Sequence, residues 1–68
     1  MKYIDFRDRI IEKLRRSGEG MTWSELKDRL DLPYRTPCPE WVNRMEREND
    51  LVREKKIGRP LIWEIRKR

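Results

Sequence analysis

The spacing of the apolar residues changes once along the chain, from a helical period to a period of two. Near the N-terminus Tyr3, Phe6, Ile10 and Leu14 recur every three or four residues, as on one face of an α-helix. Near the C-terminus the stretch LIWEI, at 61–65, has the alternation that is typical of a strand. This change of period predicts one small α+β domain over residues 1–68, with its helices first and its main strands last.

The first helix is expected over residues 3–17. Ile4 and Ile11 widen its apolar stripe, and Arg15 and Arg16 lie in its last turn, where they complement the helix dipole. Gly18 follows directly and suits the left-handed residue that ends many helices. The stripe and the stop signal therefore agree on the extent of this helix.

The second helix is expected over residues 23–30. Thr22 and Glu25 have the spacing of a capping box, in which each side chain bonds the other residue's backbone N–H. Met21 and Leu26 flank this cap at the positions of a hydrophobic staple. Two start signals thus agree on where this helix begins.

A third helix and a hairpin complete the expected order. The proline-rich stretch LPYRTPCPE predicts a connection, and a helix over residues 39–48 follows it, with Pro39 in the first turn and Asn49 as the left-handed residue after the end. Strands are expected at about 51–56 and 61–66. Gly58 lies between them and can adopt a positive φ in the turn.

Positive charge is concentrated in the expected hairpin. The chain has 18 Lys and Arg against 13 Asp and Glu, and residues 51–68 hold seven of the former and two of the latter. That segment therefore accounts for the whole net charge of +5. A basic hairpin favours contact with the phosphates of a nucleic acid. The alternative is a solvated, heat-adapted surface, since charged residues make up 46% of the chain.

Several other functions find no support in the composition. The chain has no histidine and a single cysteine, Cys38, so an internal disulfide is excluded and a zinc site lacks its usual ligands. No base accompanies the thiol, and no glycine-rich phosphate loop is present, so we expect neither an enzyme nor a cofactor. No apolar run approaches the roughly 20 residues of a membrane span. A soluble, cytoplasmic protein is expected.

The stretches TWSELKDRLDL and NDLVREKKIGRPLIWEI resemble the winged helix-turn-helix family. The first is similar to the family's second helix with its start and turn, and the second to the end of the recognition helix followed by strand, wing and strand. Over residues 3–66 the resemblance implies three helices and a C-terminal hairpin wing, with a possible short third strand at Met21–Thr22. The proline-rich turn is longer than the family's usual turn, and Asn49–Asp50 stands where a glycine is common.

The resemblance implies that the chain binds double-stranded DNA as a transcriptional regulator, with the third helix in the major groove and the wing on the backbone or minor groove. Arginine, asparagine and glutamate can all read base edges. The implied base-reading residues are Glu40, Asn43, Arg44 and Arg47. The implied phosphate contacts are Arg35 and Thr36 at the helix start and Lys55, Lys56 and Arg59 on the wing, followed by a basic tail at 66–68.

Alternatives remain open from the sequence. A winged helix can serve protein contact in a larger complex, and a basic hairpin can bind DNA or RNA without sequence preference. Ile57, at the wing tip, is either a simple turn residue or a wedge for a minor groove. We expect a monomer, or a weak homodimer through Tyr3, Ile4 and Phe6 on the first helix.

Overall fold

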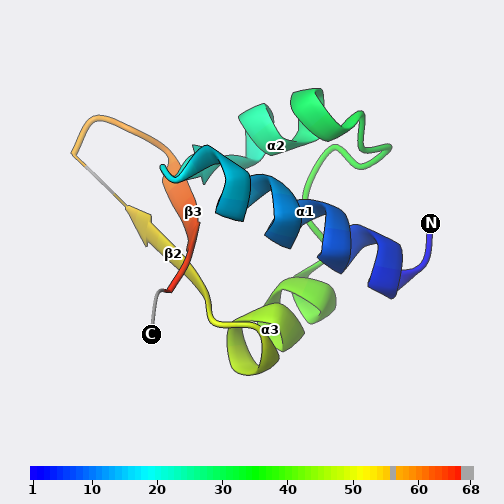
Figure 1. Cartoon of the computed structure of the whole chain (residues 1–68). Helices are drawn as coiled ribbons and strands as arrows, with labels where there is room; N and C mark the ends of the chain where they lie inside the picture. Colours follow the sequence, from blue (N-terminus) through cyan, green and yellow to red (C-terminus); the bar gives the residue numbers. More distant parts are fainter. Residues whose placement is uncertain (56, 67–68) are drawn as a thin grey trace.

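In the part of the chain that the structure describes, six secondary-structure elements follow one another, and all three helices precede the main strand pair (Figure 1). The computed structural model describes residues 1–55 and 57–66. The elements are α1 (Tyr3–Ser17), β1 (Met21–Thr22), α2 (Trp23–Leu30), α3 (Pro39–Glu48), β2 (Leu51–Lys55) and β3 (Leu61–Ile65). The three helices have their predicted bounds, and the short strand predicted at Met21–Thr22 is present. β3 ends one residue before the predicted bound, and position 56 lies outside the described residues. The chain is thus a small α+β domain.

The ends of α1 and α2 follow the predicted local signals. Gly18 has a φ of 66° and closes α1 in the left-handed region. At the start of α2, Thr22 Oγ1 accepts the N–H of Glu25 at 3.2 Å. Glu25 Oε1 accepts the N–H of Thr22 in return at 3.3 Å. The predicted capping box is therefore confirmed, and it joins the strand β1 directly to α2.

The left-handed residue after α3 lies one position later than predicted. Pro39 occupies the first turn as expected, after Cys38 as the N-cap residue. Asn49, however, has a φ of −124°, and its N–H still bonds the carbonyl oxygen of Met45. Asp50 is the left-handed residue, with a φ of 59°. Asn49 does follow Glu48, the last residue of α3, but expecting it to be the left-handed residue was wrong. Its N–H still completes a helical hydrogen bond, and the next residue, an aspartate, tolerates the left-handed region as well.

The sheet is antiparallel, with the strand order β1-β3-β2. Met21 pairs with Trp63 in the short ladder, and Leu51 pairs with Ile65 at one end of the long one. β3 is therefore the central strand. This position explains a difference from simple alternation: both Ile62 and Trp63 are buried, on opposite faces of β3. Ile62 lies against Gly20, in the segment that leads into β1.

The core fills the space between the helices and one face of the sheet. The largest side chains with less than 2% exposure are Trp63, Phe6, Ile10, Leu26, Met45 and Val42. All three helices and β3 contribute to this set. Burial of each such apolar side chain stabilises the fold by about 1.5–3 kcal/mol. The expected burial of Trp63 is confirmed, and Trp23 is partly buried and stacks on it with ring centroids 5.5 Å apart.

The predicted stripe of α1 is correct except at its edge. Ile11 is buried, but Ile4, on the same edge in the first turn, is 57% exposed. Phe6 is fully buried at the centre of the core. It is therefore unavailable to a second copy of the chain, which removes it from the surface named for a weak homodimer and leaves Ile4 and the partly buried Tyr3 there.

The proline-rich connection between α2 and α3 packs on the core through aromatic residues. Tyr34 lies with its ring 5.9 Å from that of Phe6 and 6.0 Å from that of Trp41. The indole N–H of Trp23 donates to the carbonyl oxygen of Arg35 at 3.0 Å. These contacts give the long turn a defined path, which appears at the right of Figure 1 before the chain enters α3.

Candidate nucleic-acid interface

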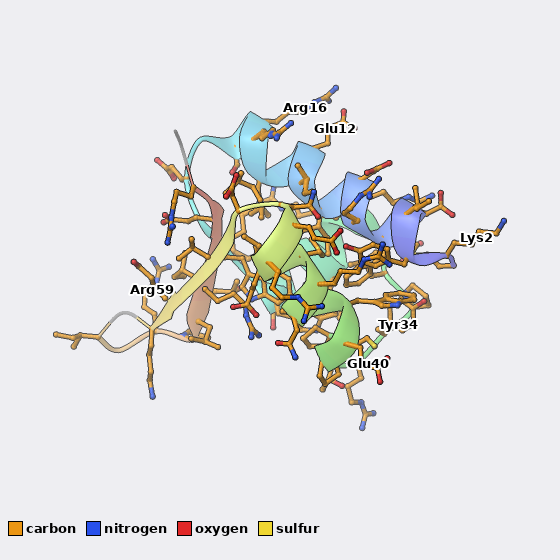
Figure 2. All side chains as sticks on the ribbon, turned by 90° about the horizontal axis from the view of Figure 1, so that it is seen from below. Lys2, Glu12, Arg16, Tyr34, Glu40 and Arg59 are labelled. Atoms are coloured by element: carbon orange, nitrogen blue, oxygen red, sulfur yellow. The ribbon has the colours of Figure 1, made fainter. Side chains whose placement is uncertain are left out.

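The polar face of α3 points away from the core. Val42 and Met45 anchor the opposite side of the helix, with exposures of 1% and 0%. All four side chains that the sequence assigned to base reading are exposed, namely Glu40, Asn43, Arg44 and Arg47. Figure 2 views the molecule from the side of α3 and shows Glu40 in its first turn, near Tyr34 of the connection. One face of one helix therefore brings the four residues together.

These four residues are not equivalent in their surroundings. Arg44 Nε donates to Glu48 Oε2 at 2.8 Å, and its guanidinium carbon lies 4.5 Å from the ring centroid of Tyr3. Arg44 is thus directed toward α1. Asn43 and Arg47 make no side-chain hydrogen bond or ion pair with any other residue in the described part of the chain. Both are therefore available for contact with a ligand.

The two residues assigned to phosphate contact before α3 lie in the connection. Arg35 and Thr36 are both exposed. The backbone of Arg35 is fixed, because its carbonyl oxygen accepts the indole N–H of Trp23. Two polar side chains thus precede the N-terminus of α3 on a backbone that is held to α2.

The hairpin of β2 and β3 extends away from the helices, as Figure 1 shows. Lys55 pairs with Leu61 at the last rung of the ladder, and Lys55 and Arg59 are exposed. Lys56, the third cation assigned to the wing, lies outside the described residues. Gly58 has a φ of 74°, so the positive φ expected for the turn is confirmed.

Arg53 joins the hairpin to α3, a role that the charge count did not anticipate. Its Nη2 lies 3.1 Å from Glu46 Oε1, and its guanidinium carbon lies 5.6 Å from the ring centroid of Trp63. Alternation along β2 places Arg53 on the same face as the buried Leu51, which is the sequence signal that could have found this role. The charge of Arg53 is therefore engaged in contacts between β2, β3 and α3 within the domain.

The opposite face of the sheet carries acidic residues. A groove of about 920 Å³ lies between the end of α1 and the strands β2 and β3. Its charged lining residues are Glu19, Asp50, Glu54, Glu64, Arg15 and Arg66. Arg66, assigned to the basic tail, donates its backbone N–H to the carbonyl oxygen of Asp50 at 2.8 Å, and Lys67 and Arg68 lie outside the described residues. The four acidic residues outnumber the two arginines, and this excess of negative charge disfavours approach of a polyanion from this side.

Outside this surface, one arginine has a pKa that a neighbouring carboxylate changes. Arg7 Nε donates to Asp8 Oδ1 at 2.9 Å, and this bond raises the pKa of Arg7 above its ordinary value. The described residues include no group of three histidine, cysteine or acidic side chains that could hold a metal ion. None of the helices within those residues has the length and apolar character required to cross a membrane.

Comparison of the chain with models of protein families, with curated proteins and with solved structures found no match in any of the three. A function for this surface is therefore argued from its geometry and its charge. The geometry consists of an outward polar helix face, a hairpin bearing exposed cations, and an ion pair that holds the two together. The charge consists of cations on the hairpin and carboxylates on the far face of the sheet.

Proposed function

We propose that this chain is a winged helix-turn-helix domain that binds double-stranded DNA and acts as a transcriptional regulator. α3 enters the major groove, and the hairpin is the wing that contacts the backbone or the minor groove. The observation that carries the proposal is the exposed face of α3 with the unengaged Asn43 and Arg47, tied through Glu46 and Arg53 to a hairpin with exposed cations.

The size and charge of the two parts suit their roles. An α-helix with its side chains is about 10–12 Å across, and the major groove of B-DNA is about 12 Å wide. Asn43 can bond adenine with two hydrogen bonds, and Arg47 can do the same with guanine. Lys55 and Arg59 on the hairpin supply the sequence-independent part of the binding energy by neutralising phosphates.

The test begins with selection of a preferred duplex from a random pool. Asn43→Ala and Arg47→Ala are then measured on that duplex and on a scrambled duplex of equal length and composition. Each change is expected to cost about 1–3 kcal/mol on the selected duplex. On the scrambled duplex Asn43→Ala changes little, because the residue is neutral, and Arg47→Ala loses only the contribution of its charge.

Arg16→Ala is the matched control for Arg47→Ala. It removes the same charge from an exposed arginine, which lies at the end of α1 remote from Glu40 in Figure 2 and pairs with Glu12 at 2.8 Å. We expect this variant to bind the selected duplex nearly as the parent does. A parent protein that enriches no sequence, or an Asn43→Ala variant that binds both duplexes like the parent, would exclude base reading by α3.

A further inference from the structure

Ile57 is the most exposed large apolar residue among the described residues. Its exposed fraction is 103%, whereas Met1, Ile4 and Leu61 are 41–57% exposed. An isoleucine so placed contributes no burial to the folded chain. Its place in the fold is also distinct, because it lies at the hairpin tip with exposed Lys55 before it and exposed Arg59 after it. The apolar group thus stands within a cationic surface.

The local structure holds Ile57 away from the rest of the molecule. The ladder of β2 and β3 ends at the pair Lys55 and Leu61, so the tip begins beyond the last rung. Gly58 adopts a φ of 74°, and a Cβ placed on it would have no atom within 4 Å. Pro60 fixes its own φ as the chain re-enters β3. Residues 57–60 are therefore exposed and unpacked against the rest of the described chain, and the side chain of Ile57 is free to contact a partner.

A partner for this tip needs two properties. It must carry anionic groups for Lys55 and Arg59, and it must offer an apolar space to the isoleucine between them. The minor groove of DNA has both, because phosphates border it and an inserted apolar side chain reaches the faces of the stacked bases. Proteins that insert such side chains partly unstack one base step and kink the duplex by about 20–90°.

We propose that Ile57 inserts between two base pairs from the minor groove and kinks the duplex held by α3. This inference rests on the function proposed above. It adds a bend in the duplex at a fixed distance from the base pairs that α3 contacts. Pyrimidine–purine steps unstack most easily. The selected duplex should therefore carry such a step where the hairpin meets it, without any hydrogen bond from the tip to a base edge.

The experiment measures bending and affinity separately. A selected duplex of about 30 base pairs, shorter than the persistence length of DNA, carries a fluorescent donor and acceptor at its two ends. Energy transfer between them reports the bend, and titration reports the affinity. The parent is expected to raise the transfer on binding. Ile57→Ala is expected to bind about tenfold more weakly, in line with the loss of buried apolar surface, and to leave the duplex straight.

Ile57→Leu is the matched control, because it keeps an apolar side chain of the same size at the same exposed position, and leucine is among the residues that insert between base steps. It should leave affinity and bending as in the parent. Both variants alter exposed side chains, so their melting temperatures should equal that of the parent. Ile57→Ala should also keep the parent's dependence of affinity on salt, since no charge is lost.

The outcomes separate this inference from the proposed function. If the parent binds the selected duplex through Asn43 and Arg47 but does not bend it, or if Ile57→Ala bends it equally, insertion is wrong and the proposed function stands. If the parent binds no duplex, both are wrong. Binding of the parent to vesicles of anionic phospholipid, with no binding to duplex, would likewise overturn both and assign the tip to a lipid surface.

Discussion

Replacement of Gly20 by alanine tests the closest approach between two segments of this fold. A Cβ at Gly20 would overlap Ile62 Cγ2 and lie 2.8 Å from Glu64 Cγ. Ile62 is 7% exposed and belongs to the central strand, and the branch at its Cβ leaves it few alternative rotamers. The methyl group cannot move aside, so the segment before β1 must shift away from β3.

The expected cost is that of overpacking at a site with little room to relax. Such changes typically cost about 1–3 kcal/mol, and we expect Gly20→Ala to lie at about 2–3 kcal/mol. For a domain of this size each kcal/mol lowers the melting temperature by about 4–8 °C, so a decrease of roughly 8–24 °C should follow. Thermal unfolding followed by circular dichroism measures it.

Two further variants separate a steric effect from a backbone effect. Gly18 has a φ of 66° but open space around its missing Cβ, so Gly18→Ala tests backbone strain alone, at about 1–2 kcal/mol. Ile62→Ala removes the methyl group that opposes Gly20. In that background Gly20→Ala should cost clearly less, because only the flexible side chain of Glu64 must still move, whereas Gly18→Ala should cost the same as before. An equal cost of Gly20→Ala in both backgrounds, or an unchanged melting temperature in the single variant, would refute the steric argument.

Two other predictions concern the cap of α2 and the charge of the wing. Thr22→Ala removes the acceptor of the Glu25 N–H and should cost about 1 kcal/mol. The proposed DNA binding should persist wherever the variant remains folded. An unchanged melting temperature would show that the cap contributes nothing. Simultaneous replacement of Lys55, Lys56 and Arg59 by alanine should weaken binding to all duplexes and flatten the slope of log affinity against log salt by about 2–3. An unchanged slope would exclude the hairpin from the interface.

The helix bounds could be predicted from the sequence because their signals are local. Gly18 stops α1 through its own φ, and the box of Thr22 and Glu25 forms between residues three apart. Asp50 shows the limit of such signals. Asn and Asp both tolerate a positive φ, so the composition of the pair at 49–50 does not determine which residue adopts it.

The exposed face of α3 could be predicted as well. Which of its charged side chains contact other parts of the fold could not. Helical period alone places Asn43 and Arg47 opposite Val42 and Met45. Whether an arginine on that helix is engaged depends on residues distant in the sequence. Arg44 meets Tyr3 of α1, and no local pattern contains that contact. The contact of Gly20 with Ile62 is hidden for the same reason, since it joins segments about forty residues apart in the chain.

The contacts of Arg44 and Arg53 within the fold determine how the affinity of a variant of α3 is interpreted. Arg44 connects one edge of α3 to Tyr3 of α1, and the pair of Glu46 with Arg53 connects the other edge to β2. A helix held at both edges and buried along its base keeps a fixed orientation in the domain. Asn43, which takes part in none of these contacts, can then be truncated without a change in the tilt of α3. An affinity lost in Asn43→Ala therefore measures a contact with the ligand, whereas a loss in Arg44→Ala would combine contact with reorientation.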